Sequence, residues 1–291
     1  MQLLLNGLIA GSLAALVAGG LALVYGVLGV FNLALGQIVL VGGYVTWWLY
    51  EGIGWSFMAS IAGGIIAGGL VTWITFRIFV EPFYKRHRFL PIVTTIALSM
   101  ILDGLILILF GESPKSIRLG GGIWHIAGAR ISVAQLGLIL ITILLLSVLA
   151  YTLHSTAIGR RIRAVVQHPH AVESFGVPAQ RLHQLLFIMS GILASCGGIF
   201  LAIDQNLTPV LAFSITIKAY AAIIAGGKGN VWGAIVCAYA IALLEQAIVG
   251  IHWFNTFYVP AGFQGTVALA VIIIFLIIRP QGLFGSVARS A

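Results

Sequence analysis

The sequence predicts an all-α, polytopic membrane protein, and two observations lead to this fold class. Of the 291 residues, 60% are hydrophobic and only 8% are charged, whereas soluble globular domains carry about 25% charged residues. Residues 1–50 contain no Asp, Glu, Lys, Arg or His, and a single span needs only about 20 apolar residues. Both observations exclude a water-soluble fold, and the first fifty residues have room for two spans.

Nine apolar runs have the length of a membrane span, which predicts about nine transmembrane helices. The runs cover residues 3–24, 31–49, 56–76, 92–110, 131–153, 184–203, 210–226, 231–249 and 261–278. The run at 210–226 is short and contains Lys218, so a half-helix or re-entrant segment is the alternative there. Eight or ten spans therefore stay open. We expect residues 1–291 to form one transmembrane domain with a polar loop at 154–183.

Basic residues between the runs predict the orientation. The loops at 77–91 and 154–183, together with the tail from residue 279, carry ten Lys and Arg residues. The loop at 111–130 lies on the opposite side by parity and carries three. Because cytoplasmic loops are enriched in Lys and Arg, we expect the N-terminus outside and the C-terminus in the cytoplasm. The net charge of +8 then reflects membrane orientation and does not indicate binding to nucleic acid.

Motifs of common catalytic sites are missing from the sequence. It contains no G-x-x-x-x-G-K-[ST], H-E-x-x-H or G-x-S-x-G pattern. Cys196 and Cys237 lie in separate apolar runs, where we expect them to pack as small apolar residues. His168 and His170 flank Pro169, with no carboxylate or thiol spaced to complete a closed metal site. We therefore expect no catalytic residue, metal or bound cofactor in this chain.

Asp103 lies near the middle of the fourth apolar run. A charged side chain at that depth costs on the order of 3 kcal/mol or more, so Asp103 should face a bundle interior or a wet cavity. Two interpretations stay open. Asp103 lines a substrate path, or it hydrogen-bonds to a neighbouring helix while protonated or paired.

The loop at 154–183 has a helical pattern. Three apolar residues recur at helical spacing after Gly159, and three basic residues occupy other faces. The apolar residues are Ile162, Val165 and Val166, and the basic ones are Arg160, Arg161 and Arg163. Pro169 is placed to begin a second short helix and Gly176 to end it. Such a stiff element could dock in a partner's groove through its apolar ridge. The alternative is a solvated basic loop near anionic lipid headgroups.

At this loop the chain resembles the LivH-type permeases of branched-chain amino acid ABC importers. That family begins the loop as T-x-x-G-R-x-x-R-A-V-x-Q and closes it with Gly. The matching residues are Thr156, Gly159, Arg160, Arg163, Ala164, Val165, Gln167 and Gly176. Three further segments match: Y-G-x-x-G-x-x-N at 25–32, the stretch from Lys218 to Glu245, and R-P-Q-G-L-F-G at 279–285. The resemblance therefore extends over nearly the whole chain.

The resemblance implies a permease subunit that hydrolyses no ATP itself. It would pair with a second, homologous permease in the bacterial cytoplasmic (inner) membrane. Two ABC ATPases would bind ATP and Mg²⁺, and a periplasmic or lipid-tethered binding protein would deliver branched-chain or related amino acids. The loop would couple the ATPases to transport. Its coupling residues would be Gly159, Arg160, Arg161, Ile162, Arg163, Val165, Val166, Gln167, Pro169, Glu173 and Gly176.

The substrate is the least determined part of this prediction. After Asn32 the family commonly has F-A-H-G-E, whereas this chain has L-A-L-G-Q, ending at Gln37. Asn32, Gln37 and Asp103 are the residues that we place in a candidate translocation path. Related permeases import urea or short amides, which is one alternative. An ion-coupled secondary transporter working alone is another, for which Asp103, Lys218 and Glu245 are the plausible ionisable residues.

Overall fold

The structure is a computed structural model that describes most of the chain up to residue 250. The described residues are 1–84, 86–87, 89–120, 122–126, 129–167, 179–227, 229–250, 266, 269–270, 273–275, 277 and 281–284. The long helices are α1 (Gln2–Leu28), α2 (Leu35–Trp47), α3 (Phe57–Ile74), α5 (Leu90–Phe110), α6 (Val133–Ser155), α9 (Ala179–Asp204), α10 (Leu211–Gly226) and α11 (Val231–Gly250). Shorter pieces are α4 (Glu81–Tyr84), α7 (Ala157–Gln167) and the π-helical segments η1 (Trp48–Gly52) and η2 (Thr75–Val80).

The helical, polytopic class is confirmed, while the count of about nine spans stays a prediction. Six helices of the described part are long and apolar enough to cross a membrane. They are Gln2–Leu28, Phe57–Tyr84, Leu90–Phe110, Val133–Ser155, Ala179–Asp204 and Val231–Ile248. Two further predicted runs are shorter helices, because α2 has 13 residues and α10 has 16. The predicted run at 261–278 lies mostly outside the described residues.

The loop between α5 and α6 contains a short β-hairpin in addition to the helices. Strands β1 (Ile123–Ile126) and β2 (Ala129–Ser132) pair antiparallel, with Ile123 opposite Ser132. Ser132 ends this hairpin and caps α6, because its hydroxyl accepts a hydrogen bond from the backbone N–H of Gln135, 3.1 Å away. The Gln135 side chain in turn accepts from the Ser132 N–H at 3.0 Å. The hairpin therefore leads directly into α6, and Ser132 is both the last residue of the hairpin and the cap of the helix.

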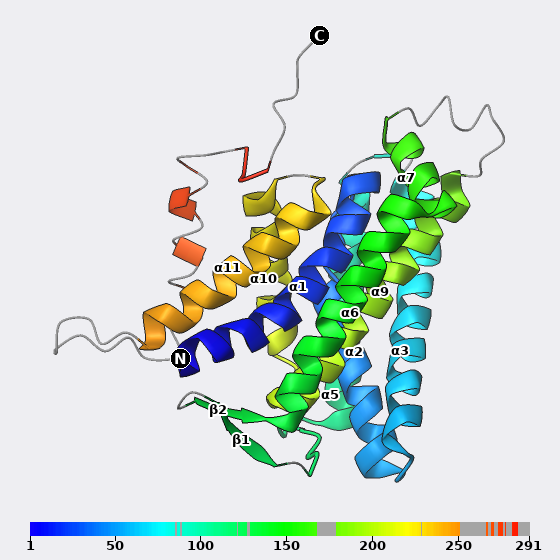
Figure 1. The fold of residues 1–291 in the computed structure, drawn as a ribbon. Coiled ribbons are helices and arrows are strands. Elements are labelled where there is room, and N and C mark those ends of the chain that lie inside the picture. The colour runs from blue at the N-terminus through cyan, green and yellow to red at the C-terminus, as the bar shows by residue number, and fades with distance from the viewer. Residues whose placement is uncertain are drawn as a thin grey trace.

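The bundle has two distinct ends (Figure 1). At one end, the side chain of Gln2 exchanges hydrogen bonds with the backbone of Arg130, so the N-terminus lies against β2. At the other end, the side chain of Gln180 donates to Glu81, which joins the 77–91 loop to the start of α9. The two basic loops therefore share an end, and the N-terminus lies at the opposite one. This arrangement agrees with the predicted parity, while the side that faces the cytoplasm stays a prediction.

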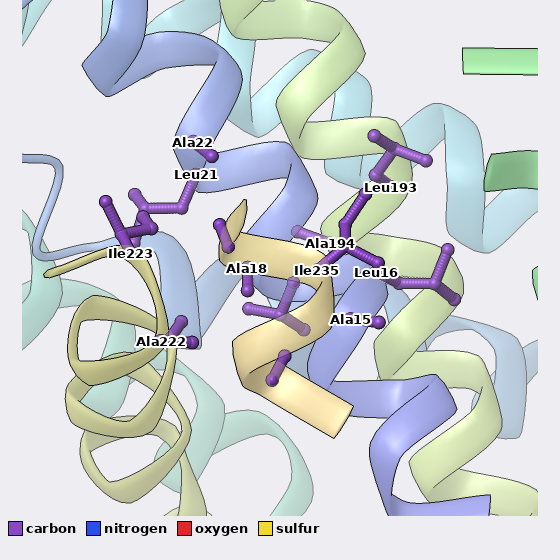
Figure 2. Close-up of a cluster of buried hydrophobic side chains, with 14 of the residues drawn as sticks. Ala15, Leu16, Ala18, Leu21, Ala22, Leu193, Ala194, Ala222, Ile223 and Ile235 are labelled. Carbon is purple, nitrogen blue, oxygen red and sulfur yellow. The ribbon is translucent and has the colours of Figure 1, made fainter. Parts of the chain in front are cut away.

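Helix α1 is central and contacts α6, α9, α10 and α11. Figure 2 shows Ala15, Ala18 and Ala22 of α1 in one cluster with Ala194 of α9 and Ala222 of α10. Small residues let helix backbones approach closely in a bilayer. Two glycines in the N-terminal half of α1 also let a neighbouring helix approach closely. A Cβ atom on Gly7 would lie 2.6 Å from Leu243, and one on Gly11 would overlap the ring of Tyr239.

The outer helices α3, α5 and α6 expose apolar side chains. Leu70, Ile108 and Leu144 are 55%, 81% and 61% exposed. Exposed apolar surface on this scale marks contact with a membrane or another protein. The spans predicted from hydropathy thus have the outward faces that a bilayer requires.

Candidate functional site

The chain breaks between α1 and α2 inside the bundle. Gly29 ends α1 with a φ of 63° and donates its N–H to Tyr25 at 2.9 Å. Irregular backbone at membrane depth needs internal hydrogen-bond partners. Two hydroxyls from other helices supply them: Thr95 accepts from the N–H of Leu33 at 3.3 Å, and Thr216 accepts from the N–H of Gly36 at 3.0 Å. The break is therefore held in place by α5 and α10.

The three residues of the predicted translocation path are buried or half-buried around this region. Asn32 lies in the break and is 1% exposed, and Gln37 in α2 is 3% exposed. Asp103 lies in α5 and is half-buried. One polar atom of each side chain is buried without a hydrogen-bond partner: Nδ2 of Asn32, Oε1 of Gln37 and Oδ1 of Asp103. Their role in transport stays a prediction.

A charged cavity lies elsewhere, between α1, α9, α10 and α11. Lys218 of α10 and Glu245 of α11 form an ion pair there, with Nζ 2.8 Å from Oε1 and 3.0 Å from Oε2. Both residues line a cavity of about 190 Å³, and Asn32, Gln37 and Asp103 are not in its lining. The sequence identified both residues as ionisable groups in apolar runs but did not predict their pairing. Opposite charges in two consecutive apolar runs are the signal from which this contact could have been predicted.

The predicted coupling loop begins as a helix. Helix α7 begins one residue after α6 ends, so the chain turns sharply at Thr156. Glycine at position 159 allows this turn, because a Cβ there would overlap the carbonyl oxygens of Thr152 and Leu153. Arg163 donates to the carbonyl oxygens of Leu153 and His154 at the end of α6. Arg160 donates to that of Ser155 at 3.5 Å. Basic side chains at a helix C-terminus satisfy its free carbonyl groups, so these two arginines fix α7 to α6.

The apolar ridge of α7 faces inward, which corrects its expected contact with a partner. Ile162 and Val165 are 6% and 3% exposed and pack against Leu182 and Leu186 of α9. The helical pattern identified an apolar face but not the surface that buries it, and α9 lies close enough to do so. Ala164 and Arg161 lie on the exposed face.

Several residues of the predicted loop cannot be placed. Pro169, Glu173 and Gly176 lie outside the described residues. Val166 and Gln167 end α7, and only their backbone is described. The proposed second helix of the loop thus stays a prediction.

A groove at the α7 end brings together segments that are distant in sequence. It has a volume of about 480 Å³, and its lining includes Gly26, Arg163, Asn230, Trp232 and Phe284. The indole Nε1 of Trp232 donates to Nε2 of His154 at 3.2 Å, and the two rings stack. Each of the four segments that carry the sequence resemblance contributes at least one residue to the lining.

The tail segment docks onto the junction between α10 and α11 beside this groove. The N–H of Leu283 donates to Ala225 at 2.7 Å, and that of Phe284 donates to Gly226 at 3.1 Å. Gly282 has a φ of 76°, in the left-handed region that favours glycine. The tail motif therefore closes the carbonyl end of α10 and lies at the same end as α7.

Comparisons with known proteins agree with this arrangement. The family model "Branched-chain amino acid transport system / permease component" matches residues 3–281. LivH of Escherichia coli K12, a high-affinity branched-chain amino acid transport system permease protein, is 24% identical over 98% of this chain and 95% of its own length. LsrC of Photorhabdus luminescens, an autoinducer 2 import system permease protein, is 26% identical over 75% of this chain and 63% of its own length.

A solved structure shows the same fold. PsaBC from Streptococcus pneumoniae, in complex with a Fab, superposes with a TM-score of 0.51 at 16% identity, covering 97% of this chain and 93% of that one. The family match spans almost the entire chain, including all the helices that form the charged cavity and the groove. The chain belongs to the family of branched-chain amino acid transport permeases, the non-catalytic, multi-pass membrane subunits of ABC importers.

Proposed function

We propose that this chain imports branched-chain or related amino acids across the bacterial cytoplasmic membrane as one half of a permease heterodimer. Two ATPase subunits hold ATP and Mg²⁺, and a binding protein delivers the substrate. The observation that carries the proposal is the groove at the α7 end, where four motif segments of the family meet. A surface assembled from distant segments on a rigid base is suited to transmit a partner's movement to several helices at once.

The docking surface consists of this groove and the exposed face of α7. Arg163 and Gly159 line the groove, and Arg161 is exposed beside them. Helix α7 is held rigidly, because its apolar ridge packs on α9 and two arginines bind the end of α6. A movement of α7 would therefore be transmitted directly to α6 and α9.

A charge reversal on the exposed face tests this docking surface. The permease is co-expressed with the second permease, the ATPases and the binding protein that the proposal assigns to its transporter, and ATPase subunits are measured after purification of the permease. We expect Arg161→Glu to lose most of the bound ATPase, since like charges and unpaired groups at an interface cost several kcal/mol. Arg118→Glu is the matched control, because Arg118 is exposed near the hairpin end. Equal ATPase recovery with both variants would contradict the proposed docking surface.

Alternative substrates and an alternative transport mechanism are tested by uptake into proteoliposomes. The chain also matches an autoinducer 2 permease, and urea or short amides are the alternative substrates predicted from the sequence. An ion-coupled transporter would move substrate without ATPases. We expect ATP-dependent uptake of L-leucine by the complete complex, and no gradient-driven uptake by this chain alone. Uptake by the chain alone along a proton or sodium gradient would overturn the ABC mechanism.

A further inference from the structure

The ion pair between Lys218 and Glu245 is unusual in its position. Among the described residues, the other ion pair, Arg77–Glu81, joins side chains one helical turn apart at the α7 end, whereas Lys218–Glu245 joins two separate helices. The side chain of Glu245 is 9% exposed and that of Lys218 is 33% exposed. A buried ion pair adds little stability compared with apolar packing. Charged groups within spans more often mark the path of a substrate.

The cavity that holds the pair is amphipathic. Its apolar wall includes Leu13 and Ala14 of α1, Ile215 of α10 and Ile241 of α11. The polar part consists of the ion pair with Gln205, Ser214 and Gln246. Binding sites for small molecules commonly combine an apolar lining with a few polar groups that fix orientation.

A second cavity adjoins this site toward the hairpin end of the bundle. It has a volume of about 240 Å³ and shares Ala10, Gln205 and Gln246 with the first cavity. Its lining also contains Asn6, Gln135 and Asp204. Gln135 donates to Asp204 at 2.8 Å, which joins the start of α6 to the end of α9. Polar side chains therefore line two adjoining cavities between the ion pair and the end that is predicted to face outside.

We propose that Lys218 and Glu245 bind the two charged groups of a zwitterionic amino acid during its passage. This inference rests on the proposed function and extends it to the substrate class and its binding residues. The substrate carboxylate would take the place of Glu245 at the Lys218 ammonium, and the substrate ammonium would take the place of Lys218 at the Glu245 carboxylate. Each charge of the protein stays paired before and after binding, so the exchange leaves no buried charge uncompensated.

The proposed site also discriminates against uncharged substrates. A neutral molecule such as urea could not replace either partner, so it would leave the ion pair closed. The apolar wall formed by Leu13, Ile215 and Ile241 would contact an aliphatic side chain. The site thus favours an aliphatic amino acid over urea or a short amide.

Uptake of L-leucine by proteoliposomes with the complete wild-type or variant complex tests the inference. All variants receive the same loaded binding protein, so delivery is unchanged. We expect Glu245→Gln to lower uptake at least about tenfold, which corresponds to about 1.4 kcal/mol, while the complex still assembles and hydrolyses ATP. Glu112→Gln, at an exposed position near the hairpin end, is the matched control and should transport normally. Normal leucine uptake by Glu245→Gln would overturn the inference.

A charge swap separates substrate binding from a purely structural ion pair. The double variant Lys218→Glu/Glu245→Lys keeps both charges in contact but reverses their order across the cavity. A structural pair predicts restored uptake, whereas the proposed site predicts that uptake stays low, because the aliphatic group would then point away from the apolar wall. Restored uptake would therefore overturn the inference and leave the proposed function intact. Failure of the wild-type complex to transport any amino acid would overturn both.

Discussion

The two halves of α1 have similar compositions but different surroundings. The C-terminal half presents Ala15, Ala18 and Ala22, all at most 1% exposed, to small residues of α9 and α10 (Figure 2). The N-terminal half presents Ala10 and Ala14 to the cavity that contains the ion pair. Alanines thus serve close packing in the C-terminal half, whereas Ala10 and Ala14 leave space beside charged groups in the N-terminal half.

This difference arises from the partner helices and not from α1 itself. Around the C-terminal half, α10 and α9 contribute Ala222 and Ala194, so the helices pack without charged groups. Around the N-terminal half, α10 and α11 contribute Lys218 and Glu245. The C-terminal half of α1 therefore packs closely in the upper part of the bundle, while the N-terminal half lines the ion-pair cavity in the lower part (Figure 1).

The largest effect is expected from a larger side chain in the closely packed half. Ala18→Leu would force additional atoms into a site that is 0% exposed. Such overpacking costs about 1–3 kcal/mol, so the free energy of unfolding should fall by about that amount. Thermal unfolding in detergent measures the change. An unchanged midpoint would show that this half of α1 is not closely packed.

The equivalent change in the cavity half should affect transport more than stability. Ala14 is half-buried and lines the cavity, so Ala14→Leu fills open space and leaves the unfolding midpoint close to that of the wild type. Leucine uptake should fall about tenfold, or about 1.4 kcal/mol in the barrier, because the added side chain takes up room for the substrate. Comparison of Ala14→Leu with Ala18→Leu in both assays separates the two halves. Uptake at the wild-type rate in Ala14→Leu would show that the substrate does not pass through this cavity.

The smallest effect is expected outside both halves of α1. Ser132→Ala removes the N-cap of α6, which typically costs about 1 kcal/mol. Since Ser132 is absent from the lining of the ion-pair cavity, leucine uptake per folded complex should match the wild type. A large loss of uptake in this variant would mean that the hairpin end takes part in transport, in addition to supporting the fold.

The sequence predicted most of the helices but not their tertiary pairing. Apolar runs identify spans because each span must satisfy its own backbone hydrogen bonds in lipid, and eight of the nine predicted runs contain a described helix. The pairing of Lys218 with Glu245 depends on how α10 and α11 are rotated, which hydropathy does not encode. The same limit applies to α7, where the pattern identified the apolar ridge of Ile162 and Val165 but not its partner, α9.

The most direct test of the account is the accessibility of the two halves of α1 from outside the cell. Single cysteines at Ala14 and Ala18 are treated with an impermeant thiol reagent in intact cells that express the whole transporter. We predict that Ala14→Cys reacts, because it lines the ion-pair cavity and the adjoining cavity extends toward the hairpin end, and that Ala18→Cys does not, because its site is closed to solvent. Equal labelling of both positions, or labelling of Ala14→Cys only from the cytoplasmic side in inverted vesicles, would contradict the account.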